Sequence, residues 1–240
     1  MPKFVLKSLA AVSAAALLFV GAPGDAHAAK FLKLGYAVAE GNAYDTFAKE
    51  FKKNIEKLTN GEIKVRNFCC FKMGGEQEMF KKLQLGTLDG TIIAQNNAGP
   101  FYPKIDLLVL PYMLQNYEHA VKVVDGPVGQ MIWKDMPKEA GVHLVSIAVI
   151  SFRHIYNSKQ AINSIEDFAP LKYRVPKNVV MVDTYKAFGS DPVPLAWSET
   201  LTADQTGTVD GGDLPIDVIY SQKFHEVATV SDTQLRAHET

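Results

Sequence analysis

A short phrase that occurs twice is the feature that most constrains how this chain of 240 residues can fold. Residues 84–90 read QLGTLDG and residues 205–211 read QTGTVDG, and Glu78 matches Glu199 at the same spacing of 121 residues. Two copies indicate two similar lobes. The alternative is that each copy is an ordinary helix–turn–strand joint made of common turn residues.

The repeated residues suit particular places in a fold. Gly86 and Gly207 fit the end of a helix, where a left-handed residue is often needed. Asp89 and Asp210, each followed by glycine, are expected at the carboxyl edge of a sheet. Open α/β sheets bind their ligands outside that edge, so the repeat also predicts where a site would lie.

The hydrophobic pattern after residue 30 predicts an α/β fold. Residues 32–38 alternate as in a half-buried strand, residues 43–58 have apolar side chains at helical spacing, and residues 63–68 suit a second strand. A further helix around residues 79–83 and a strand through residues 92–93 follow. This order predicts mostly parallel sheets flanked by helices.

A nine-residue run, Val142 to Ile150, is rich in β-branched and small apolar residues and predicts a central strand buried on both faces. Arg153 is then expected just past the end of that strand, where the chain crosses between lobes. We predict lobe I over residues 29–150 and lobe II over residues 151–240, with the ligand between them.

Residues 1–28 are typical of a cleavable secretory signal. Lys3 and Lys7 precede an apolar run over residues 9–20, and Ala-His-Ala at 26–28 offers a cleavage site. The run is shorter than the ~20 residues that span a bilayer, and an uncleaved anchor is the alternative. We expect a secreted, soluble mature protein.

Charge and motifs exclude several classes of function. The 25 Lys and Arg balance 26 Asp and Glu, which leaves no electrostatic surplus for nucleic acid. The sequence contains no G-x-S-x-G, H-E-x-x-H, G-x-x-x-x-G-K or G-x-G-x-x-G motif, and its histidines lack metal-ligand spacing. We therefore predict neither a metal nor a cofactor.

The only cysteines, Cys69 and Cys70, are adjacent, so they suit neither a two-cysteine metal site nor a disulfide that closes a long loop. We interpret them as small residues at the end of a strand, one buried and one exposed. A vicinal disulfide is the alternative, which export would permit.

Two arginines in apolar, strand-like surroundings are the candidate ligand-binding groups. Arg174, in PLKYRVP, is costly to bury without an anion, and its guanidinium can hold a carboxylate through two hydrogen bonds. A buried ion pair explains Arg174 equally well, and is the favoured explanation for Arg153. Trp197 and Tyr112 are candidate pocket walls or core residues.

A linked series of motifs resembles one known family. AINSIEDFAPLKYRVP at 161–176 is followed by FGSDPVPLAWSE, GTVDGGDLP and QKFHEV, and preceded by GGEQEMFKKLQLGTLDG, VLPYMLQNYEHA and FRHIYNS. In order and spacing these resemble the periplasmic substrate-binding subunits of tripartite ATP-independent periplasmic (TRAP) transporters, from about Phe31 to Val230.

The resemblance implies a two-lobed periplasmic-binding-protein fold with a ligand cleft between lobes, no catalysis, a monomer, and membrane permease subunits as partners. It implies that Arg174 clamps the ligand carboxylate, that Arg153 adjusts the ligand, and that Trp197 lines the pocket. Weaker assignments place Glu76 and Tyr112 in the site, and Asp213 is also expected among the ligand-binding residues. Family ligands are sialic acid, C4-dicarboxylates, keto acids and sugar acids.

Some residues depart from the family pattern. Leu214 replaces an asparagine that commonly contacts ligand, so one hydrogen bond is expected to be lost. Pro170 replaces a glycine, and Asp204 occupies a position that is usually apolar, which is unfavourable for core packing. Family members continue beyond the position of Thr240, so we expect lobe I to be incomplete. A non-binding remnant and an exported enzyme acting on an organic acid are the alternative functions.

Overall fold

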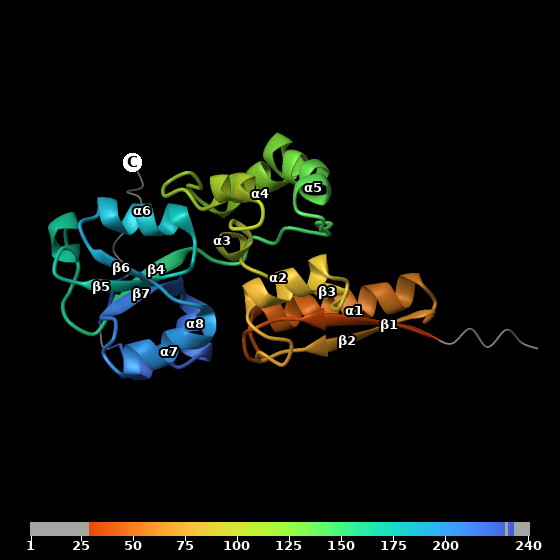
Figure 1. The fold of residues 1–240 in the computed structure, drawn as a ribbon, viewed down its shortest axis with the longest axis horizontal. Helices are drawn as coiled ribbons and strands as arrows, with labels where there is room; N and C mark the ends of the chain where they lie inside the picture. The colour runs from red at the N-terminus through yellow and green to blue at the C-terminus, as the bar shows by residue number, and fades with distance from the viewer. Residues whose placement is uncertain (1–28, 229, 233–240) are drawn as a thin grey trace, which may run out of the picture.

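The computed structural model describes residues 29–228 and 230–232 and contains two separate β-sheets (Figure 1). The predicted signal sequence, residues 1–28, lies outside the described residues. The first sheet uses residues 30–91 and the second uses residues 153–232. The lobe boundary between residues 150 and 151 stays a prediction.

The first sheet is parallel, with β1 between β2 and β3. Helix α1 connects β1 to β2 and is capped at its N-terminus by Asn42, whose side chain accepts hydrogen bonds from the amides of Tyr44 and Asp45. The strand predicted at residues 92–93 lies slightly earlier. The elements of this half are β1 (Lys30–Gly35), α1 (Ala43–Leu58), β2 (Ile63–Phe68), α2 (Glu76–Gln84) and β3 (Gly90–Thr91).

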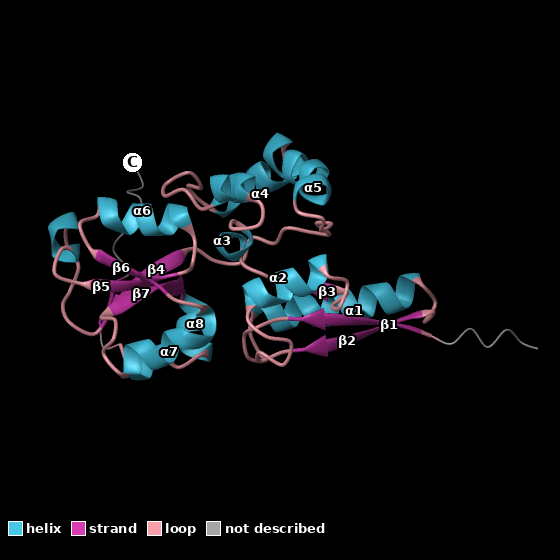
Figure 2. Cartoon of the chain, in the orientation of Figure 1, coloured by secondary structure: helices cyan, strands magenta, loops and turns pink. Residues whose placement is uncertain are grey.

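The second sheet has the strand order β6-β5-β7-β4-β8, with β5 parallel to both neighbours and β4 antiparallel to β7 and β8. Helix α6 covers one face, and α7 and α8 cover the other (Figure 2). The predicted α/β class is confirmed. The elements are β4 (Arg153–Asn157), η2 (Ile165–Phe168), β5 (Lys172–Val175), α6 (Val179–Ala187), β6 (Asp191–Pro194), α7 (Trp197–Gln205), β7 (Gly211–Pro215), α8 (Ile216–Ser221), η3 (Phe224–Glu226) and β8 (Val230–Asp232).

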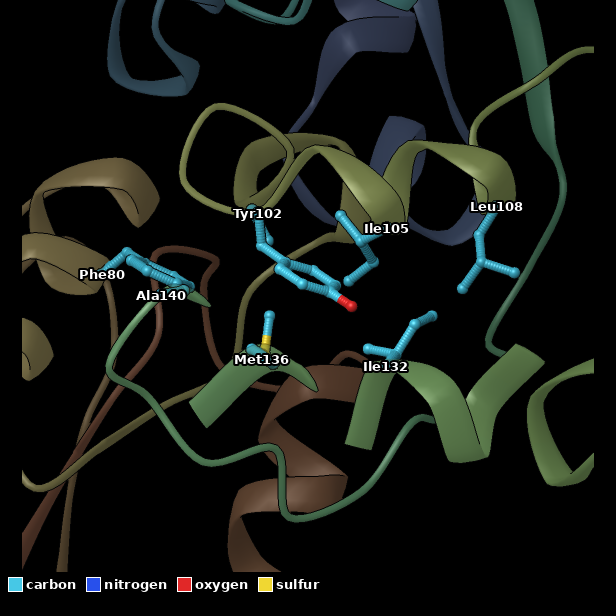
Figure 3. Close-up of a cluster of buried hydrophobic side chains, with 8 residues drawn as sticks. Phe80, Tyr102, Ile105, Leu108, Ile132, Met136 and Ala140 are labelled. Atoms are coloured by element: carbon cyan, nitrogen blue, oxygen red, sulfur yellow. The ribbon is translucent and has the colours of Figure 1, made fainter. Parts of the chain in front are cut away.

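A helical layer connects the two sheets in the chain. Its core surrounds Tyr102, which is fully buried and lies beside Ile105 of η1 and Met136 and Ile132 of α5 (Figure 3). Phe80 of α2 joins the same cluster, so the layer packs on the first sheet's helices. The elements are α3 (Gln95–Ala98), η1 (Pro103–Leu108), α4 (Tyr117–Asp125) and α5 (Pro127–Glu139).

The prediction of a central strand over residues 142–150 is wrong, because this run forms neither helix nor strand. Val145 is 62% exposed. A strand buried on both faces needs partners in a sheet, and in the described part of the chain the first sheet ends at β3, which is two residues long. Arg153 accordingly begins β4 instead of following a strand.

The sequence repeat is a structural repeat. Helices α2 and α7 occupy equivalent residues, and the glycines after them, Gly86 and Gly207, have φ of 68° and 67°. In each copy the amide two residues beyond the C-cap, from Thr87 or Thr208, donates to a carbonyl of the last turn at 2.9 Å. Both glycines therefore terminate their helices in the same left-handed conformation.

The expected position of the repeated aspartates is wrong. Asp89 and Asp210 precede β3 and β7 and so lie at the beginnings of these strands, away from the carboxyl edge. Their Oδ2 atoms accept the amides of Lys33 and Lys172, each at 2.8 Å. An aspartate at this position satisfies a backbone donor of the neighbouring strand, which is a structural role.

Cys69 and Cys70 follow β2 and are joined in a vicinal disulfide. Cys69 is buried and Cys70 is exposed, as the strand-end interpretation predicts, but that interpretation did not include the bond. In the described part of the chain no helix is long and apolar enough to cross a membrane.

We expect Gly86→Ala and Gly207→Ala to destabilise the protein by similar amounts, about 1–2 kcal/mol each, because a Cβ is unfavourable in the left-handed region. Nothing lies within 4 Å of the added Cβ at either site, so packing contributes little. Urea denaturation would measure this. Asparagine at the same positions is the control and should cost less; equal costs for alanine and asparagine would contradict the explanation.

Candidate functional site

Arg174 is a buried cation without a carboxylate partner. It lies in β5, its side chain is 3% exposed, and its Nη2 donates to the carbonyl of Leu195 at 2.9 Å. Its buried Nε has no hydrogen-bond partner, and no ion pair of the described residues includes it. Burial and then the charge of Arg153 lower its pKa to about 10. An anion placed here would supply the missing acceptor.

Arg153 has a partner within the protein. Its Nε lies 2.5 Å from Oδ2 of Asp213, its Nη2 lies 3.2 Å from Oδ1, and the same Nη2 also donates to the Asp213 carbonyl. Asp213 is paired across the sheet with Ile155, and Arg153 begins the same strand. The ion pair that the sequence favoured for Arg153 is therefore present, and it also engages Asp213.

Glu76 and Trp197 occupy equivalent positions of the repeat, each as the first residue of its helix, α2 or α7. Glu76 is 6% exposed, and its Oε2 accepts from the amide of Ala94 at 3.2 Å and from the side chain of Asn97. Burial raises the pKa of the Glu76 carboxyl, and the nearby positive charge of Arg174 opposes this shift.

Trp197 touches both halves of the molecule. Its ring stacks on Phe224 at 5.6 Å between centroids, and the guanidinium carbon of Arg174 lies 5.7 Å from its ring centroid. It packs against the apolar clusters of both sheets. Its indole Nε1 is buried without a hydrogen-bond partner, and so is a second donor that lacks an acceptor.

A cavity of about 150 Å³ lies between the two helix N-termini. One side is made by the start of α2 with Asn97, the other by the start of α7 with Lys177. Across it, the Gln77 side chain donates to the carbonyl of Lys177 at 3.2 Å and joins the halves. A larger cavity of about 330 Å³ lies elsewhere, against α4, α5 and residues 146–147.

The six predicted site residues do not all lie around one cavity. Glu76 and Trp197 line the cavity, Arg174 lies against Trp197, and Arg153 and Asp213 pair with each other. Tyr112 does not line it and is 64% exposed in the loop after η1. No sequence pattern pointed to Asn97, and Lys177 could have been inferred from its place just after Arg174-Val-Pro.

Leu214 is 3% exposed and packs in the apolar cluster of Tyr156, Val218, Ile219 and Phe224. It offers no side-chain hydrogen bond. The loss of a polar group predicted at this position is therefore accompanied by a gain in buried apolar surface.

Residues 34–234 match the DctP family, the bacterial extracellular solute-binding proteins of family 7. The chain belongs to this family. It is 39% identical over 188 residues to a solute-binding protein of Verminephrobacter eiseniae, which covers 78% of this chain and 55% of that protein. It is 30% identical over 212 residues to the sialic acid-binding periplasmic protein SiaP of Vibrio cholerae, with 88% of this chain and 66% of that protein covered.

Solved structures of TRAP periplasmic solute-binding proteins have the same fold as this chain. A TRAP periplasmic solute-binding protein from Polaromonas, bound to D-erythronate, superposes with a TM-score of 0.82 at 39% identity, covering 84% of this chain and 66% of that one. Its counterpart from Roseobacter denitrificans, with bound L-galactonate, gives 0.78 at 33%, covering 83% and 66%. This chain thus spans between about half and two thirds of these relatives. The family binds solutes and is not enzymatic.

We expect opposite effects from removing the two arginines in ligand-free protein. Arg153→Ala leaves the buried Asp213 carboxylate unpaired and should cost about 3 kcal/mol, the lower end for buried pairs because Arg153 is partly exposed. Arg174→Met removes a buried charge with no carboxylate partner and should be neutral or stabilising.

Urea denaturation of both variants would measure this difference. The double variant Arg153→Ala/Asp213→Ala is the control and should recover part of the loss, since neither charge then remains buried alone. Equal destabilisation by Arg153→Ala and Arg174→Met would contradict this account of the two charges.

Proposed function

We propose that this chain is an extracytoplasmic solute-binding protein that captures a small organic acid by its carboxylate and delivers it to the membrane subunits of a TRAP transporter. The observation that carries the proposal is the buried Arg174, whose Nε lacks an acceptor and which forms no ion pair with another described residue. A carboxylate supplies both through charge-assisted hydrogen bonds.

The other site residues contact different parts of the ligand in this proposal. Trp197 provides an apolar wall and an indole donor beside the carboxylate. Glu76 and Asn97, on the opposite side of the cavity, contact polar groups of the ligand, and Glu76 suits hydroxyls, which can donate to it. Arg153 contributes less, because Asp213 already neutralises it.

Relatives support the ligand class. They include proteins solved with D-erythronate, galactonate, L-galactonate and succinate, all of which are small carboxylates. Hydroxylated sugar acids suit a cavity that pairs one cation with polar side chains. We propose export to the periplasm through residues 1–28 and action as a monomer.

Capture involves closure of the two halves. Trp197 packs on the apolar clusters of both sheets, and the Gln77–Lys177 hydrogen bond crosses the cavity. Closing the halves over the ligand excludes water and strengthens the Arg174 contact. The same movement changes the outer surface that membrane subunits contact, which couples ligand binding to docking.

Thermal unfolding with D-erythronate, L-galactonate, succinate, 2,3-diketo-L-gulonate and sialic acid tests the proposal. A ligand at about 100 times its Kd stabilises by about 2.7 kcal/mol, which for a domain of this size raises the Tm by roughly 5–10 °C. Arg174→Met should abolish the shift, and the exposed Lys186→Met serves as the matched control. A cooperative transition that no acid shifts would instead favour the non-binding remnant.

Trp197→Ala should weaken binding by about tenfold or more while Trp197→Phe retains most affinity, because the ring provides the pocket wall and the contact between halves. Isothermal titration calorimetry would measure both. If alanine and phenylalanine were equivalent, the indole would have no role in the site beyond core packing.

A further inference from the structure

Asp204 is a partly buried carboxylate beside the site that the proposed mechanism does not use. It lies on α7, two turns after Trp197, so both side chains lie on one face of the helix. Its Oδ2 is 3.0 Å from the hydroxyl of Tyr156, a residue that is 1% exposed. Among the described residues it belongs to no ion pair.

The sheet places this acid next to Arg174. Arg174 on β5 and Tyr156 on β4 are both register partners of Gly212 on β7, so the three residues form one row and point to the same face. A Cβ at Gly212 would lie 3.0 Å from the Tyr156 hydroxyl and 3.1 Å from the carbonyl of Arg174. Because Gly212 has no side chain, the Tyr156 ring occupies the space above it, and the Tyr156 hydroxyl hydrogen-bonds to Asp204 at the end of this row.

We propose that Asp204, through Tyr156, makes the Arg174 site bind its organic anion together with a proton. Asp204 is a positioning residue: it does not contact the ligand, and its charge affects the Arg174 site through Tyr156, which lies between them. The inference rests on the proposed function, because it concerns the same ligand carboxylate.

Charge balance around Arg174 couples Asp204 to the ligand. Burial raises the pKa of the Asp204 carboxyl to about 6, while the Tyr156 hydrogen bond and the charge of Arg174 favour its ionised form. A ligand carboxylate on Arg174 neutralises that charge and adds a second negative one nearby. Both effects raise the pKa of Asp204 further, so ligand binding takes up a proton.

The sign of the pH dependence follows. Affinity is highest where Asp204 is already protonated, below pH 6, and falls as pH rises from about 6 to the pKa of the ligand-bound protein. If the ligand raises that pKa by about one unit, the Kd is about tenfold larger at pH 8 than at pH 5.

Other titratable groups near this face could give a similar profile. His154 lies on the same face of β4 as Tyr156, and Asp217 of α8 and His225 of η3 lie in the layer that covers it. Arg153 and Asp213 pair on the opposite face. Variants of the two histidines and of Asp217 are therefore needed as controls.

The test is calorimetric titration of the full chain with D-erythronate, L-galactonate and succinate between pH 5 and pH 8, in buffers of different ionisation enthalpy that report proton uptake. Wild type should show the loss of affinity and, for a pKa rise of about one unit, the uptake of about half a proton midway through the transition. Asp204→Asn should remove both and bind more tightly than wild type at pH 8. His154→Gln, His225→Gln, Asp217→Asn and the exposed Asp183→Asn should retain the wild-type profile.

A second measurement needs no ligand. The raised pKa means that folded Asp204 holds its proton to higher pH than unfolded Asp204, so wild type loses stability relative to Asp204→Asn as pH rises from about 4 through 6. If Asp204→Asn fails to fold, the double variant Asp204→Leu/Tyr156→Phe removes carboxylate and hydroxyl together and should also bind independently of pH.

The outcomes separate the two proposals. Binding with a Kd that does not change with pH, or a profile lost in a histidine or Asp217 variant instead, overturns the role of Asp204 and leaves the proposed function standing. An Asp204→Asn protein that binds more weakly at every pH also overturns it, in favour of a purely structural role. Failure of all three acids to bind at pH 5 overturns both proposals.

Discussion

The guanidinium of Arg174 is almost fully buried with one carbonyl acceptor and no ion pair to any residue that the structure describes, and burying a charge in this way is energetically costly. Gly212 beside it has no side chain, the face of Trp197 lies 5.7 Å from it, and Arg153 is neutralised separately by Asp213. The unpaired charge of Arg174 destabilises the ligand-free protein. A bound anion removes this cost, and the free energy that is recovered contributes to the affinity for the anion.

The two halves of the site derive from one repeated unit. Glu76 and Trp197 are equivalent residues of the repeat, each beginning a helix that ends at a left-handed glycine. The repeat fixes the same helix direction in both halves and points both N-termini at one cavity. The two halves offer the ligand different groups because the equivalent positions carry different side chains, the acid Glu76 in one half and the aromatic Trp197 in the other.

Sequence patterns predicted short-range structure well and long-range structure less well. The helix over residues 43–58 and the strand over residues 63–68 were predicted within their observed bounds, since period and turn residues are local signals. The run over residues 142–150 has the composition of a buried strand but forms no strand, because a strand depends on a partner that the pattern cannot specify. The disulfide of Cys69 and Cys70 was left as an alternative for a related reason, since adjacency permits the bond without requiring it.

The sequence alone determined the α/β class, the repeat, the family and the two arginines, because these are written in residue type and spacing. Only the tertiary structure decided which arginine is free. Arg153 and Asp213 are 60 residues apart in sequence and meet because β4 and β7 are antiparallel neighbours, whereas none of the described strands brings an acid into an ion pair with Arg174. Charge pairing depends on which strands lie side by side, and that is set by packing of the whole chain.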